Sequence, residues 1–232
     1  MQKQLKRVAL PSHPAQHAAE ASSCISNPRG PPGRESKGTR LMKRLALVTG
    51  ILALTAPLAL AQTSTWAIDP AHSEVDFSVR HMTVSNVHGR FGGVQGNIAL
   101  NETDATKSTV SVTIDMNTLD TGVTARDTDV KSSNFFDVAK FPTATFASTS
   151  VAKSGTHLKV VGNLTLHGIT RPVELDVDGP SATVPGMDHK PHSGYSATTT
   201  INRKDFGVGP NYGAAMVSDE IKLIIELEVV KQ

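Results

Sequence analysis

The sequence is poor in cysteine: the 232 residues contain a single one, Cys24. From residue 62 onward there is none, so that part of the chain cannot form disulfides or use thiol chemistry. A hydrophobic core must therefore hold it together, and about 170 residues are enough to build one.

Motifs for nucleotide binding and for catalysis are also missing. The glycine cluster of residues 89–96, GRFGGVQG, fits neither a Walker loop nor a dinucleotide fingerprint. We interpret it as a sharp bend in a strand. The chain has no G-x-S-x-G elbow, no cysteine nucleophile outside residues 1–61 and no evident carboxylate pair. The sequence thus predicts no catalytic residue, no cofactor and no enzyme.

Positive charge is concentrated near the N-terminus. Residues 1–61 hold nine of the 23 Lys and Arg residues and two of the 21 Asp and Glu residues. Residues 62–232 therefore carry 14 basic and 19 acidic side chains, a net charge near −5. A mildly acidic domain without a stripe of Lys and Arg lacks the basic surface that binds nucleic-acid phosphates. We therefore expect no nucleic-acid partner.

Residues 42–61 read MKRLALVTGILALTAPLALA, the pattern of a secretory signal peptide. Lys43 and Arg44 give the positive start, residues 45–58 the apolar core, and residues 59–61 a cleavage site of small residues. The apolar run is shorter than the ~20 residues that span a bilayer. We therefore expect cleavage before Gln62, export to the periplasm and no membrane-spanning segment afterwards.

Residues 1–41 are rich in Pro, Ser, Gly and basic residues and show no apolar periodicity, so they are predicted to be disordered. A signal peptide normally begins at the start of a chain. We therefore interpret Met42 as the true initiator and residues 1–41 as an over-extended translation, with an unusually long n-region as the alternative.

Residues 62–232 alternate between apolar and polar side chains in segment after segment, as half-buried strands do. The clearest case is Ile221, Leu223, Ile225, Leu227 and Val229. Roughly eight strands are expected, against two short helix candidates: a turn or two over residues 80–87, and residues 125–133 with Thr124 as N-cap. Many strands without covering helices predict one all-β domain, an eight-stranded antiparallel barrel whose interior is packed solid or holds one ligand.

Two groups of residues could carry function. Phe135, Phe136, Phe141 and Phe146 lie within twelve positions, either as a plug of one barrel end or as the lining of a ligand pocket. Asp188, His189 and His192 lie close together in a loop rich in Pro and Gly. A metal site needs three or four convergent ligands, so we predict no metal there.

Four segments resemble the YceI-like family of exported polyisoprenoid-binding proteins, in this order and spacing. They are AHSEVDFSVRHMTVSNVHGRFGGVQGNIAL, DVKSSNFFDVAKFPTATF, VGNLTLHGITRPVELDV and INRKDFGVG. The resemblance covers about residues 66–231. It implies a lipocalin-like, eight-stranded antiparallel barrel with an elongated apolar cavity for a long-chain lipid, a periplasmic location and, as an option, a homodimer.

The resemblance also implies a set of ligand-binding residues: Phe77, Val79, His81, Met82, Phe91, Phe135, Phe136 and Phe141. It implies a structural polar pair between Arg203 and Asp205. The expected function is that of a carrier for a polyisoprenoid or quinone-like lipid. Two alternatives remain open, an enzyme acting on such a lipid with His81 or His88 as general base, and a structural domain with a filled barrel.

Overall fold

The computed structural model describes residues 62–232. The predicted disordered segment, the signal peptide and Cys24 lie outside the described residues. The described part of the chain forms eleven strands, one α-helix and three short 3₁₀ helices. The strands are β1 (Thr63–Ile68), β2 (Glu74–His81), β3 (Ser85–Phe91), β4 (Val94–Asn101), β5 (Thr109–Asp115), β6 (Thr143–Ser154), β7 (His157–Leu166), β8 (Ile169–Asp178), β9 (Val184–Pro185), β10 (Pro191–Asn202) and β11 (Val217–Lys231). The helices are η1 (Ala105–Lys107), η2 (Met116–Thr118), α1 (Thr124–Lys131) and η3 (Arg203–Phe206).

Eight strands close into an antiparallel barrel, which confirms the predicted fold class. The order around the barrel is β11, β1, β4, β5, β6, β7, β8 and β10, and β10 returns to β11. The longest ladder closes the ring, because β10 pairs with β11 from His192–Val230 to Asn202–Glu220. Closure buries the apolar face of every strand without the help of covering helices.

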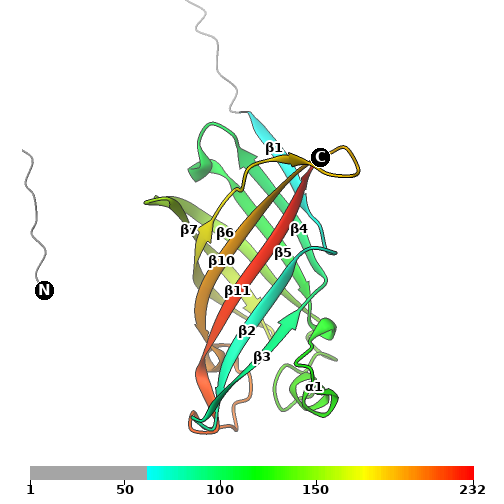
Figure 1. The fold of residues 1–232 in the computed structure, drawn as a ribbon. Helices are drawn as coiled ribbons and strands as arrows, with labels where there is room; N and C mark the ends of the chain where they lie inside the picture. Colours follow the sequence, from blue (N-terminus) through cyan, green and yellow to red (C-terminus); the bar gives the residue numbers. More distant parts are fainter. Residues whose placement is uncertain (1–61) are drawn as a thin grey trace, which may run out of the picture. The chain divides into compact units, whose positions relative to one another are not determined.

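Strand β11 changes its neighbour along its length. Its first part pairs with β2, from Val217–His81 to Glu226–Glu74, and its last residues pair with β1. The β2–β3 hairpin therefore continues the wall where β1 has ended. Figure 1 shows this hairpin beside β11, with α1 next to the hairpin at the same end of the barrel.

The hairpin replaces the helical turns predicted for residues 80–87, and that prediction was wrong. Met82 and Thr83 adopt left-handed conformations with φ of 49° and 57°, as the two central residues of a type I′ turn do. The Val84 N–H donates to the His81 carbonyl at 3.0 Å, and the Arg80 guanidinium donates to the Thr83 carbonyl. Neither turn residue is Gly or Asn, so the usual sequence signal for such a turn is absent.

The second helix candidate is confirmed as α1, but its predicted N-cap is wrong. The helix begins at Thr124, and Val123 occupies the N-cap position without a side-chain hydrogen bond. Asp127 in the first turn instead accepts hydrogen bonds from the N–H and the hydroxyl of Thr121. This contact joins α1 to the segment that follows η2.

The predicted alternation in the last strand is confirmed. Ile221, Leu223, Ile225 and Leu227 pack against the core, Val229 is buried, and Lys222, Ile224 and Glu226 are exposed. Among residues 62–232, no helix is long and apolar enough to cross a membrane.

Candidate functional site

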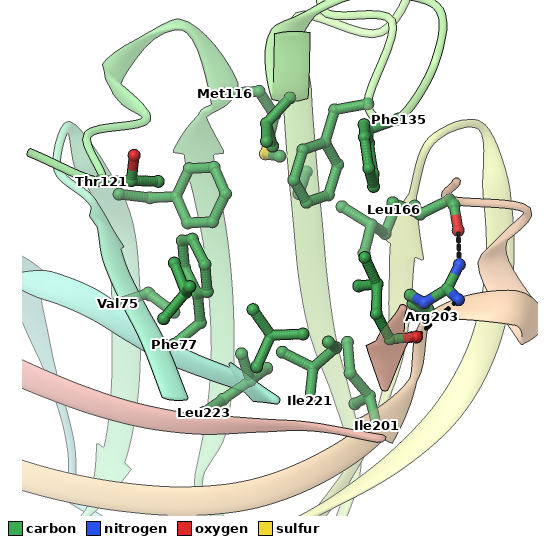
Figure 2. Close-up of a pocket in the computed structure, with 18 of the residues that line it drawn as sticks. Val75, Phe77, Met116, Thr121, Phe135, Leu166, Ile201, Arg203, Ile221 and Leu223 are labelled. Atoms are coloured by element: carbon green, nitrogen blue, oxygen red, sulfur yellow. Dashed lines mark hydrogen bonds between the residues drawn. The ribbon is translucent and has the colours of Figure 1, made fainter. Parts of the chain in front are cut away.

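The barrel interior contains two apolar cavities that lie in series. The outer cavity, of about 300 Å³, is lined by β2, β3, α1, η3 and the first half of β11. The inner cavity, of about 140 Å³, lies among β4 to β8, β10 and the second half of β11. Four side chains line both: Val75, Ile114, Leu164 and Leu223. Figure 2 shows Val75, Phe77, Ile221 and Leu223 directed into the outer cavity.

Aromatic rings form one wall of the outer cavity. The Phe77 and Phe91 ring centroids lie 5.5 Å apart, and Phe136 meets Phe91 edge-on at 5.7 Å. Phe135 stacks on Tyr212 at 4.6 Å. These rings come from β2, β3, the segment after α1 and the segment before β11, so the fold brings together aromatic residues that lie far apart in the sequence.

Two glycines make room for two of the phenylalanines. A Cβ atom at Gly89 would collide with the Phe77 ring, which lies directly across the β2–β3 ladder. Likewise, a Cβ atom at Gly162 in β7 would collide with the ring of Phe146 in β6. Each ring therefore lies against bare backbone, a close approach that only glycine permits.

Charged groups line the outer cavity but not the inner one. Arg80, Arg126, Asp129 and Arg203 contribute to the outer cavity, and the side chains around the inner cavity carry no charge. Arg126 is held in place because it donates from Nε to the Thr121 hydroxyl and from Nη2 to the Thr121 carbonyl, both at 2.8 Å. The site thus has a polar end near α1 and η3 and an apolar end toward η1 and the start of β5.

Arg203 is buried, with 3% of its surface exposed, and its donors are directed at the chain that closes the cavity. It donates to the carbonyls of Val208, Gly209, Tyr212, Val217 and Ser218 and forms an ion pair with Asp219 at 2.9 Å. Burial lowers the pKa of Arg203, and Asp219 opposes that shift. Arg203 therefore positions residues 207–217 rather than binding a ligand (Figure 2).

The predicted pair between Arg203 and Asp205 is wrong. The partner carboxylate comes from Asp219 in β11, and the Asp205 carbonyl instead accepts a hydrogen bond from Arg171. Asp205 lies in η3 beside Arg203 in sequence, but the guanidinium reaches across to the loop and strand that follow.

Tyr195 in β10 lines the inner cavity, and burial raises its pKa to about 12. The phenol is therefore neutral across the physiological pH range. The remaining polar residues of this lining are Ser108, Thr109 and Thr199. The inner cavity can hold an apolar chain, but it has no charged group with which to bind an ionic head group.

Six of the eight predicted ligand-binding residues line the outer cavity: Phe77, Val79, His81, Phe91, Phe135 and Phe136. Met82 lies at the hairpin turn, 54% exposed, outside both linings. Phe141 also lies outside them and packs against His167, with ring centroids 4.6 Å apart, and over Gly168. The fourth member of the phenylalanine cluster, Phe146, lines the inner cavity.

Several residues of the site were not found from the sequence. Thr121, Arg126 and Tyr212 line the outer cavity. Their segments carry no periodic pattern that points inward. The contacts of Arg203 are mostly to backbone carbonyls, which the sequence does not reveal. The two residues weighed as a general base differ in position: His81 lines the outer cavity, whereas His88 alternates with the inward Val87 and faces outside.

Comparison with known proteins gives consistent matches. The model of the YceI-like domain matches residues 66–229. A UPF0312 protein of Enterobacter sp. (strain 638) is 37% identical over 192 residues, which cover 81% of this chain and 96% of that protein. Protein YceI of Salmonella newport (strain SL254) is 39% identical over 165 residues, covering 69% of this chain and 83% of the relative.

Solved structures show the same fold. The YCEI protein of Campylobacter jejuni is 29% identical, with a TM-score of 0.59, over 64% of this chain and 87% of its own. A polyisoprenoid binding domain from Saccharophagus degradans is 18% identical, with a TM-score of 0.55, over 74% of this chain and 100% of its own. The sequence matches and the closed eight-stranded barrel around an apolar interior agree. This chain therefore belongs to the YceI-like domain family.

Proposed function

We propose that this protein is an exported carrier that holds one long-chain amphiphilic lipid, of the polyisoprenoid or quinone-like class, inside its barrel. One observation carries the proposal: two apolar cavities lie in series, and charged side chains line only the outer one. The chain of the lipid occupies the inner cavity and its polar end lies near Arg126. The polyisoprenoid-binding domain with the same fold supports this ligand class.

The energetics favour such a ligand. Each buried CH₂ group contributes about 0.8 kcal/mol, so ten of them give roughly 8 kcal/mol before ordering costs. Micromolar binding corresponds to about 8 kcal/mol net, so a longer chain, with more buried groups, must offset the ordering costs. The outer cavity, at about 300 Å³, lies at the lower end of the ~300–1,000 Å³ of small-molecule sites.

The test is mass spectrometry of lipid extracted from the purified protein. We expect an amphiphile with a long apolar chain in near-stoichiometric amount. Phe77→Asp places an unpaired charge in the aromatic wall and should remove the lipid, whereas Glu226→Gln, on an exposed outward position, should retain it. Circular dichroism shows whether Phe77→Asp still folds. A folded, delipidated wild-type protein that binds no lipid would contradict the proposal.

Export is a separate part of the proposal and rests on the sequence of residues 42–61. N-terminal sequencing of protein from a periplasmic fraction should give Gln62 as the first residue. Protein that retained residues 45–60, or that occurred only in the cytosol, would overturn this part and leave lipid binding untouched.

A further inference from the structure

A cluster of carboxylates and imidazoles lies on the outside of the barrel, far along β11 from the cavity mouth. Glu228 is near the end of β11, and Asp69 and His72 lie in the β1–β2 connection. His192, at the start of β10, contacts Glu228 and Asp188. His72, His192 and Glu228 line an open cleft of about 460 Å³, which shares Pro180, Tyr195 and Leu227 with the lining of the inner cavity.

The backbone holds the β1–β2 connection against β11. The Asp69 N–H donates to the Glu228 carbonyl at 2.9 Å. The Ser73 hydroxyl donates to the same carbonyl at 3.3 Å and accepts from the Glu228 N–H at 3.0 Å. Ser73 itself is buried. These bonds fix the backbone positions from which Asp69, His72 and Glu228 project.

The side chains converge on one point. One ligand atom each of Asp69, His72 and Glu228 lies within 4.8 Å of the other two, and His72 Nδ1 lies 2.8 Å from Asp69 Oδ2. A tetrahedral zinc ion takes nitrogen and oxygen ligands at about 2.0–2.2 Å. Small side-chain movements would therefore place all three ligand atoms around one ion, and the His72 side chain, 65% exposed, is free to make them.

A second layer of contacts orients the carboxylates. Asp69 Oδ1 accepts the Ala71 N–H at 2.9 Å, so Oδ2, which contacts His72 Nδ1 in this structure, is the oxygen that would bind an ion. Glu228 Oε1 lies 2.6 Å from His192 Nδ1, and His192 Nε2 lies 2.9 Å from Asp188 Oδ1. Hydrogen bonds of this kind to ligating carboxylates are a regular part of metal sites.

We propose that Asp69, His72 and Glu228 bind a divalent transition-metal ion of the zinc type, with His192 and Asp188 as the supporting layer. An imidazole among the ligands favours Zn²⁺ over Mg²⁺ and Ca²⁺, which prefer all-oxygen sites. The cleft leaves the fourth position open to water or to an exogenous ligand. This site does not depend on lipid binding. The sequence prediction of no metal considered only Asp188, His189 and His192, and of these His192 and Asp188 belong to the supporting layer.

Isothermal titration of the full chain, without an affinity tag, with Zn²⁺ tests the proposal. We expect one site whose affinity falls at least tenfold in His72→Ala and in Glu228→Gln. The matched control is His157→Ala, because His157 Nδ1 lies 2.9 Å from Asp176 in an exposed pair elsewhere on the barrel. That variant should bind as the wild type does. His13, His17 and Cys24 are the same in the wild type and in every variant, so they cannot produce the difference.

The visible absorption spectrum of the protein with Co²⁺ in place of Zn²⁺ reports the coordination geometry. The spectrum of tetrahedral Co²⁺ should appear in the wild type and in His157→Ala and should be lost in His72→Ala. Equal Zn²⁺ affinity in all four proteins would overturn the proposal. So would an equal loss in His157→Ala, or Ca²⁺ binding as tightly as Zn²⁺.

Discussion

Phe77 lies directly across the β2–β3 ladder from Gly89, and its ring fills the space that a side chain at position 89 would need. The aromatic wall of the outer cavity therefore depends on a residue that contributes no side chain to it. An added methyl group at position 89 must push the Phe77 ring away from β3 and toward the cavity, unless the strands separate.

We accordingly expect Gly89→Ala to weaken binding of a long-chain lipid about tenfold, because the displaced ring occupies part of the ligand's volume. Titration of delipidated protein with a fluorescent fatty-chain probe measures this. Gly92→Ala is the matched control, since a Cβ atom there meets nothing within 4 Å. If both variants bound like the wild type, the ring of Phe77 would not limit the cavity.

Arg203→Met should destabilise the fold by about 3–5 kcal/mol, because it removes a buried charge from its partner and leaves several carbonyls without a donor. Urea denaturation gives the free energy of unfolding. Arg171→Met serves as the control: this exposed arginine donates one hydrogen bond, to the Asp205 carbonyl, and its loss should cost less than about 1 kcal/mol. Similar losses in the two variants would refute the positioning role of Arg203.

Stability should fall at alkaline pH because of Tyr195. Its pKa is about 12 in the folded barrel, against 10.0 for an ordinary tyrosine. The raised value means that Tyr195 adds stability below pH 10 and that this contribution is lost as the pH rises toward 12. Tyr195→Phe should lack this decline while resembling the wild type near neutral pH. Unfolding midpoints across the range would show it, and equal slopes in both proteins would mean that the phenol is not buried.

The barrel itself could be predicted because its strands alternate strictly, as Ile221, Leu223 and Ile225 do in β11. The β2–β3 turn could not, because Met82 and Thr83 adopt left-handed conformations without the glycine or asparagine that usually marks them. The number of strands was also underestimated, because β9 spans two residues without a periodic pattern and because the start of β3 was predicted to be helical.

The candidate site was predictable only in part. The phenylalanines of the aromatic wall stand out by composition, but the direction of each ring depends on tertiary packing: Phe135 faces the cavity, whereas Phe141 packs on His167. The cluster outside the barrel joins His72 to Glu228, which are far apart in the sequence. Only the pairing of β11 with its neighbours brings them together.

The most direct test of the carrier function is a titration of delipidated protein with polyprenyl ligands of increasing length. The account predicts that affinity rises by up to about fourfold per added CH₂, from about 0.8 kcal/mol each, and levels off when both cavities are full. Ile225→Trp narrows the inner cavity, so the affinity of this variant should level off at a shorter ligand chain. Ile224 lies on the exposed face, and the affinities of Ile224→Trp should follow those of the wild type. Affinity that did not depend on chain length, or a plateau unchanged in Ile225→Trp, would contradict the account.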